Sequence, residues 1–144
     1  MKRNYLTLYF FFTLCIFLCS NTQAEPLVTI RSYDNTEYKN PTNEFIPQQK
    51  IYIDIRLQGI EPGEHNVTLD WLSPDGKVQS QNHKKTFIDD TGCYQQMFFI
   101  HLSRLGIFTR MFAGSSYPRS FLGEWTCRFF LDGVKLQEYN FTIR

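Results

Sequence analysis

The amino-acid sequence predicts an all-β fold, a single antiparallel β-sandwich of about seven or eight strands, on three observations. Apolar and polar residues alternate with a period of two in several short segments, which is typical of strands with one buried face. Turns rich in Gly, Pro, Asp and Asn separate these segments. No convincing helical period of 3.6 residues is sustained along the chain. Strands without helices favour a sandwich.

The alternation is clearest in two segments. Four aliphatic side chains occupy every second position of residues 51–58, and Val67, Leu69 and Trp71 repeat this pattern. Turn sequences at Ser73-Pro74-Asp75-Gly76 and Asp132-Gly133 predict hairpins. Further strands are expected at residues 27–33, 77–80, 83–88, 94–102, 125–131 and 136–143. We expect Trp71 and Trp125 to lie in the core, because each belongs to the apolar side of its segment.

Residues 1–24 have the three parts of a signal peptide. Lys2 and Arg3 form a positive amino end, and residues 5–18 form an uncharged, mostly apolar stretch. The stretch is too short for a comfortable membrane-spanning helix. Small Ala24 fits the position before the cleaved bond. The sequence therefore predicts an exported protein, periplasmic or secreted.

Two alternatives to cleavage after Ala24 remain open. One is an uncleaved amino-terminal anchor, and the other is a lipid on Cys19; either would tether the protein to a membrane. After cleavage, residues 25–144 are expected to form one domain with no membrane span. They hold 13 basic and 14 acidic residues, a net charge of −1. This balance gives no electrostatic support for binding nucleic acid or an anionic membrane surface.

The cysteines and histidines predict a disulfide and no metal site. Cys93 and Cys127 are the only cysteines after residue 24, and two such residues in an oxidising compartment favour a disulfide. Without a nearby histidine pair, they do not form a zinc site. His65, His83 and His101 lack the spacing of metal ligands. We expect no metal and no cofactor.

Two short motifs resemble catalytic sequences without their context. Asp90-Thr91-Gly92 has the letters of the aspartic protease triplet, but Asp89 stands where a hydrophobic strand should end. A polar turn is the better interpretation. Ser115 and Ser116 lie outside the Gly-x-Ser-x-Gly pattern of a nucleophile elbow. The sequence therefore predicts that the protein is not an enzyme.

Residues 104–122 combine high apolar content with no regular spacing. Aromatic, Met and Arg side chains are the types enriched in protein interfaces. We expect a partner to contact these types here, at Arg104, Phe108, Arg110, Met111, Phe112, Tyr117 and Arg119. The alternative is a long crossover whose aromatic side chains fill the core.

The strand and turn motifs resemble those of immunoglobulin-like β-sandwich domains of bacterial envelope proteins. The residues that carry this resemblance are Gly63, Val67-x-Leu69-x-Trp71-x-x-Pro74-Asp75-Gly76-Lys77, Gly123-x-Trp125-x-Cys127-x-Phe129-x-Leu131-Asp132-Gly133 and Phe141-x-Ile143. The resemblance implies a fold and assigns no functional residue, because many functions share such sandwiches. The chain also departs from true immunoglobulin domains, in which a Trp lies between the two Cys; here Trp71 precedes both.

These observations predict a non-catalytic exported module that binds or assembles with another envelope or secreted protein. Contact is expected through a free sheet edge or through residues 104–122. The alternative is a sandwich that binds carbohydrate or another small ligand. Its stacking platforms would be Tyr94, Tyr117 and Trp125.

Overall fold

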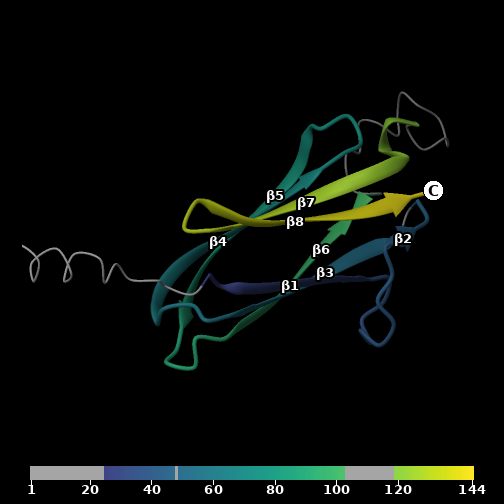
Figure 1. The fold of residues 1–144 in the computed structure, drawn as a ribbon. Coiled ribbons are helices and arrows are strands. Elements are labelled where there is room, and N and C mark those ends of the chain that lie inside the picture. Colours follow the sequence, from purple (N-terminus) through teal and green to yellow (C-terminus); the bar gives the residue numbers. More distant parts are fainter. Residues whose placement is uncertain (1–24, 48, 103–118) are drawn as a thin grey trace, which may run out of the picture.

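The computed structural model describes residues 25–47, 49–102 and 119–144, which form two β-sheets packed face to face (Figure 1). The elements in chain order are β1 (Leu27–Tyr33), β2 (Glu44–Phe45), β3 (Lys50–Gln58), β4 (Gly63–Leu72), β5 (Val78–Ile88), β6 (Tyr94–His101), the short 3-10 helix η2 (Arg119–Phe121), β7 (Gly123–Leu131) and β8 (Val134–Ile143).

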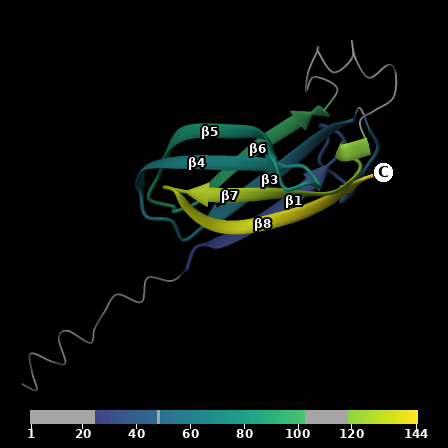
Figure 2. The ribbon, with the colours of Figure 1, turned by 90° about the horizontal axis from the view of Figure 1, so that it is seen from above.

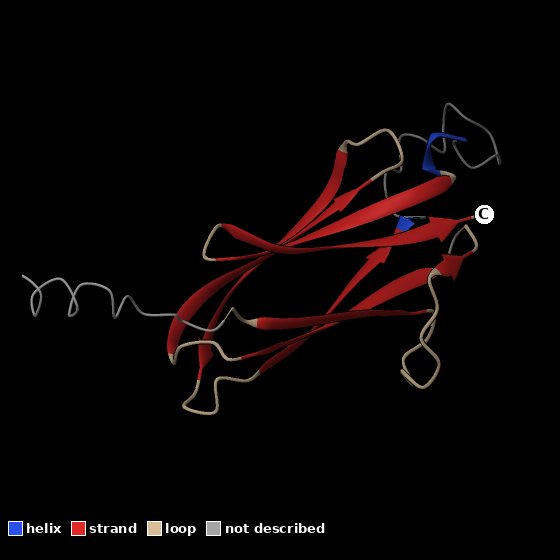
Figure 3. Cartoon of the chain, in the orientation of Figure 1, coloured by secondary structure: helices blue, strands red, loops and turns tan. Residues whose placement is uncertain are grey.

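The first sheet has the strand order β1-β3-β6, and the second has the order β2-β8-β7-β4-β5. All pairings are antiparallel except the short parallel pairing of β2 with β8. The view from above in Figure 2 shows one sheet lying over the other. Strands make up most of the coloured chain in Figure 3. The predicted all-β sandwich of seven or eight strands is confirmed.

The core lies between the sheets and consists of the apolar side of each alternating segment. In β3, Ile51, Ile53 and Ile55 are fully buried. The intervening residues point outward, where Tyr52 and Arg56 are at least partly exposed and Asp54 is buried. The facing β4 and β7 bury their own alternate residues in register, as in the pair Leu69 and Phe129. The apolar residues at every second position therefore form the inner face of each sheet, and the residues between them form the outer face.

Both tryptophans lie fully buried in this core, as the sequence predicts. The rings of Trp125 and Phe141 are stacked with centroids 6.2 Å apart, and Trp71 meets Phe141 edge-on at 6.3 Å. Each indole N–H has an acceptor: Trp71 Nε1 donates to Asn82 Oδ1 over 2.7 Å, and Trp125 Nε1 donates to the Phe121 carbonyl over 2.8 Å. Both large side chains are thus buried without an unpaired donor.

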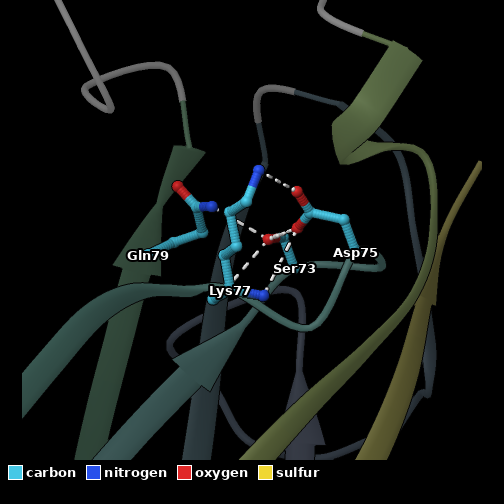
Figure 4. A network of polar contacts seen from close by, with 4 residues as sticks. All are labelled: Ser73, Asp75, Lys77 and Gln79. Atoms are coloured by element: carbon cyan, nitrogen blue, oxygen red, sulfur yellow. Dashed lines mark hydrogen bonds and ion pairs between the residues drawn. The ribbon is translucent and has the colours of Figure 1, made fainter.

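A polar network fixes the turn between β4 and β5 (Figure 4). Gly76 adopts a φ of 78°, and its N–H donates to the Ser73 carbonyl over 2.8 Å. The buried Ser73 hydroxyl donates to the Asp75 carboxylate and accepts from Gln79 Nε2 over 2.8 Å. Lys77 Nζ lies 2.9 Å from Asp75 Oδ2. The hydrogen bond from Ser73, followed by that from Lys77, lowers the pKa of Asp75 to about 2.

A second polar contact ties the turn between β7 and β8 to the start of β4. Asp132 and Gly133 have φ values of 50° and 80°, as the predicted type I′ hairpin turn requires. Asp132 Oδ1 accepts from the Asn66 N–H over 2.8 Å, and Asp132 Oδ2 lies 2.7 Å from His65 Nδ1. His65 Nε2 lies 2.8 Å from the Glu61 carbonyl oxygen. We call these three side-chain contacts the His65 clamp.

The turn between β5 and β6 is polar, as the sequence predicts for the Asp90-Thr91-Gly92 triplet. Asp89 Oδ1 accepts from the Thr91 N–H over 3.0 Å, and the Gly92 N–H donates to the Asp89 carbonyl over 3.0 Å. The hydrogen bond from the Thr91 hydroxyl lowers the pKa of Asp89. Asp90 lies exposed at the tip of this turn.

Candidate functional site

The two sheets end in four edge strands, and these edges differ in length and charge. β2 is only two residues long, whereas β5 has 11 residues and β6 has eight. β5 contains His83, Lys84 and Lys85, and Lys84 is in register with the buried Val67, on the inner side of the sheet. Lysine on an edge strand, and an inward-pointing charge above all, discourages pairing with another chain. β5 is therefore a guarded edge.

The edge at β1 is covered in part by the chain that follows it. The Thr42 N–H donates to the Ser32 carbonyl over 2.9 Å, and the buried Ser32 hydroxyl also donates to the Thr42 carbonyl. The same hydroxyl shares a hydrogen bond of 2.7 Å with the Tyr139 hydroxyl of β8. The carboxyl end of β1 is thus closed by contacts within the protein.

β6 differs from the other long edges because its eight residues include no Lys, Arg, Asp or Glu. It pairs with β3 along its whole length and has no second strand partner in the part of the chain that the structure describes. Near the beginning of β6, a side chain of β5 reaches across to it: Lys84 Nζ donates to Gln96 Oε1. Beyond that point β6 presents an uncharged backbone edge, the kind to which an extended segment adds most readily.

Aromatic side chains gather on the outer face of the sheet that β6 borders. Tyr38 meets Tyr33 and Tyr52 edge-on, with ring centroids 5.6 and 5.9 Å apart. Tyr52 lies in register with Phe99 of β6, and their centroids are 6.1 Å apart. Met97 lies two residues before Phe99 on the same face. We call Tyr33, Tyr38, Tyr52, Met97 and Phe99 the aromatic face.

Phe99 is the exposed end of the aromatic face. Its side chain is 58% exposed although it borders Tyr52, whereas Tyr33 is buried beneath its neighbours. Phe87 of β5 is even more exposed, at 71%, but its partner in register is the charged Glu64. A single exposed aromatic residue is ordinary on a protein surface, but a connected group beside an open edge is typical of binding surfaces.

The charged residues of β1, β3 and β6 are mainly positive, whereas the loop that carries Tyr38 adds Asp34 and the Glu37–Lys39 ion pair. Lys50 Nζ lies 6.0 Å from the centroid of the Phe99 ring, a weak cation–π contact. Asp54 is the only carboxylate in β1, β3 and β6, and it is buried. Its Oδ2 accepts from Arg56 Nε and its Oδ1 accepts from Gln95 Nε2, each over 2.9 Å. Asp54 is thus already paired within the sheet.

Tyr94, at the start of β6, lies partly buried against the core and does not form an open platform. Its hydroxyl is buried with no hydrogen-bond partner in the described residues, and burial raises the pKa of Tyr94 to about 12. Trp125 is fully buried. These two rings are therefore not the exposed stacking platforms that the alternative, ligand-binding function would need, and the core position expected for Trp125 is confirmed. Tyr117, the third predicted platform, lies outside the described residues.

Most residues predicted to bind a partner lie outside the described part of the chain. Arg104, Phe108, Arg110, Met111, Phe112 and Tyr117 are in this group. The backbone of Arg119 begins η2, which ends at Phe121, and β7 begins at Gly123. The aromatic face was missed because its members are scattered over three strands and a loop. The alternation in residues 51–58 could have placed Tyr52 on the outer face, but the pairing of β3 with β6 is needed to bring Phe99 beside it.

The predicted disulfide between Cys93 and Cys127 is not formed, and both are free cysteines in the structure. Cys127 lies in the middle of β7, in register with Trp71 and Tyr139, and is fully buried. Burial raises the pKa of its thiol well above the usual value. Cys93 is exposed in the turn before β6. The two cysteines cannot form a disulfide in this fold because the Cys127 thiol, on a central strand, faces the core, whereas Cys93 is exposed to solvent.

The described residues hold no group of three or more His, Cys, Asp or Glu side chains arranged to bind a metal ion. Within the same ranges, none of the helical segments has the length and apolar character that a membrane crossing requires.

Comparison with known proteins gives similarity of fold alone. No family model and no curated protein matches the sequence. An alkylpurine DNA glycosylase of Pseudomonas fluorescens, solved with DNA containing an abasic site analog, superposes with a TM-score of 0.52 at 13% identity over 84% of this chain and 31% of the glycosylase. A β-glucosidase of Listeria innocua in complex with glucose gives a TM-score of 0.52 at 5% identity over 82% of this chain and 16% of the glucosidase. A bacterial adhesin of Mobiluncus mulieris matches at a TM-score of 0.45, with 9% identity over 82% of this chain and 48% of the adhesin.

These comparisons overturn the prediction that the protein is not an enzyme. The two structures with the higher TM-scores are both enzymes, and the present chain spans less than a third of either one. A β-sandwich of this fold can therefore be one part of an enzyme. Because fold does not determine function, the absence of a catalytic motif in this sequence does not exclude an enzyme.

Proposed function

We propose that this chain is an exported binding or assembly module that takes up an extended segment of another exported protein along β6. The observation that carries the proposal is the combination of an uncharged edge strand with an exposed aromatic residue, Phe99, on the adjoining aromatic face. In strand addition, main-chain hydrogen bonds supply affinity, and alternate side chains of the added segment supply specificity.

The contrast between β5 and β6 supports this choice of edge. Pairing along β5 would bring a partner against His83, Lys84 and Lys85 and would have to accommodate the inward-pointing lysine. Pairing along β6 meets no charged side chain on the strand itself. An added segment would instead place every second side chain beside Met97 and Phe99.

We also propose that the sandwich belongs with the immunoglobulin-like domains of bacterial envelope proteins, periplasmic or secreted. The signal-peptide features of residues 1–24 support the location. The two-sheet architecture and the fold-level similarity to bacterial proteins support the class of domain. Both statements are consistent with a module that works by contact with another exported protein.

Site-specific crosslinking tests the proposal with a matched pair of positions. A photoreactive phenylalanine analogue replaces either Phe99 or Phe87, the two most comparable exposed aromatic residues on edge strands. After irradiation in the cells that export the protein, adducts should form from position 99 and not from position 87. Met97→Lys, which adds a charge to the open edge, should remove the adduct while changing the free energy of unfolding by less than about 1 kcal/mol.

Two results would count against this function. Equal crosslinking from both positions would mean that exposure alone, and not the β6 edge, decides contact. An adduct from position 99 that survives Met97→Lys would mean that the partner touches the aromatic face without pairing with the strand.

A further inference from the structure

We infer that the segment bound along β6 has an acidic residue two positions away from an aromatic residue. This inference rests on the proposed strand addition at β6 and states the chemistry of the partner. It follows from the order of side chains on the outer face and from the charges that surround them.

The order of side chains fixes the spacing. Phe99 and His101 are consecutive outward residues of β6, in register with Tyr52 and Lys50 of β3 respectively. Residues opposite each other on neighbouring strands share a face, and successive residues on one face are two apart. A strand added to β6 therefore sets one side chain beside Phe99 and the next outward side chain beside the His101 and Lys50 row. This spacing holds for a parallel or an antiparallel segment.

The charge at the second position favours a carboxylate. Lys50 is exposed, leans to within 6.0 Å of the Phe99 centroid and makes no ion pair with any described residue. Arg31, on the same outer face, is also exposed and forms no ion pair within the described ranges. The sheet's single carboxylate, Asp54, is already engaged by Arg56. A partner carboxylate thus meets an ammonium group that has no ion-pair partner among the described residues.

The first position favours an aromatic residue. The Phe99 ring is tilted 42° from the Tyr52 ring and remains more than half exposed. An aromatic side chain on the added strand would extend the series of edge-on and tilted rings that already runs from Tyr38 to Phe99. Cross-strand aromatic pairs are among the favourable pairs on a sheet face.

Synthetic peptides provide the test, with the full chain as receptor and fluorescence anisotropy as the measurement. The parent peptide is an alternating threonine-rich segment with glutamate and tyrosine two positions apart, prepared in both orders. Replacing its glutamate by glutamine should weaken binding about threefold and replacing it by lysine about tenfold, more strongly at low salt. The protein variant Lys50→Glu should reverse this order of preference. Lys85→Glu, at an exposed position on the outer side of the guarded edge, is the matched control and should leave it unchanged.

N-methylation separates failure of this inference from failure of the proposed function. Methyl groups on one alternate set of peptide amides should abolish binding, and methyl groups on the other set should not, because only one set faces β6. If this alternation appears but glutamate, glutamine and lysine peptides bind alike, strand addition stands and the acidic preference is refuted. If a peptide with glutamate and tyrosine adjacent binds as well as the parent, the spacing is refuted. Binding insensitive to either set of methyl groups, or no binding, overturns strand addition and this inference with it.

Discussion

Deprotonation of His65 should destabilise the domain, because the His65 clamp requires both ring nitrogens to donate. Nδ1 faces the Asp132 carboxylate at 2.7 Å and Nε2 faces the Glu61 carbonyl at 2.8 Å, and both of these groups only accept. The hydrogen bond to Asp132 is the main cause that raises the pKa of His65. The hydrogen bond from the Asn66 N–H, followed by that from His65, lowers the pKa of Asp132. The folded protein therefore favours the imidazolium–carboxylate pair.

The two pKa shifts define the pH window of this stabilisation. A raised His65 pKa contributes stability that is complete below the unfolded value of about 6.5 and is lost as pH rises through the folded value. A lowered Asp132 pKa contributes stability that is present above about 3.9 and is lost as pH falls through the folded value. A hydrogen bond to a charged group contributes about 1.5–3 kcal/mol. Because the Asp132 side chain is 46% exposed, solvent competes, and we expect about 1 kcal/mol.

Urea unfolding followed by tryptophan fluorescence measures this contribution. The free energy of unfolding should fall by about 1 kcal/mol between pH 5.5 and pH 8.5 in the parent protein. In His65→Gln this part of the pH dependence should disappear, whereas His83→Gln is a control that should retain it. Asp132→Asn keeps a residue that tolerates a φ of 50° but removes the charge, so the His65 pKa measured by NMR titration should fall. An unchanged pH dependence in His65→Gln would refute the clamp.

Three further predictions concern packing and thiols. Trp125→Ala should lower the free energy of unfolding by about 3–5 kcal/mol, because the residue is fully buried; a loss below 1 kcal/mol in urea unfolding would contradict this. Gly123→Ala should cost about 1–3 kcal/mol by the same measurement, since φ is +124° and the new Cβ would lie 3.3 Å from Pro74 Cγ; a neutral effect would show that the turn adjusts. Mass analysis of the folded protein after brief alkylation should find Cys93 modified and Cys127 unmodified, and a mass two hydrogens lower with neither modified would restore the disulfide.

The sequence alone was sufficient to predict which residues of most strands are buried and where the hairpin turns lie. The alternation around Ile53 and Leu69 correctly divided buried from exposed positions, because burial of one face imposes a period of two on any strand of a sandwich. The Asp132-Gly133 turn was predictable because its backbone conformation tolerates few residues. The strand pattern was less clear in the sequence of β5, where two short strands were expected at 77–80 and 83–88. The structure has one continuous strand, because pairing with β4 stabilises polar residues that show no strand pattern of their own.

Relations between distant segments were the part that the sequence did not determine. A disulfide needs two cysteines on positions that face each other, and facing depends on strand order and register. The sequence placed Cys127 correctly on an apolar face, yet the same burial keeps it from the exposed Cys93. The candidate site has the same origin. Tyr52 and Phe99 are 47 positions apart in the sequence, and only the β3–β6 pairing places their rings together.

The same reasoning explains why the candidate edge was recognisable only from the fold. An uncharged strand such as β6 is ordinary in the centre of a sheet, where both sides of the backbone are paired. In the described part of the chain, β6 lies at an edge and has a strand partner on one side only. Conversely, the polar sequence of β5 alone predicts only a weak strand. Once the fold places β5 at a sheet edge, Lys84 and Lys85 have a clear role, because lysines on an edge strand discourage pairing with another chain. The two edges lie at one side of the sandwich, where Lys84 reaches Gln96. A protein under selection only to avoid association would be expected to guard both edges. The difference between the two edges, as the described residues show them, supports the proposal that a partner pairs along β6.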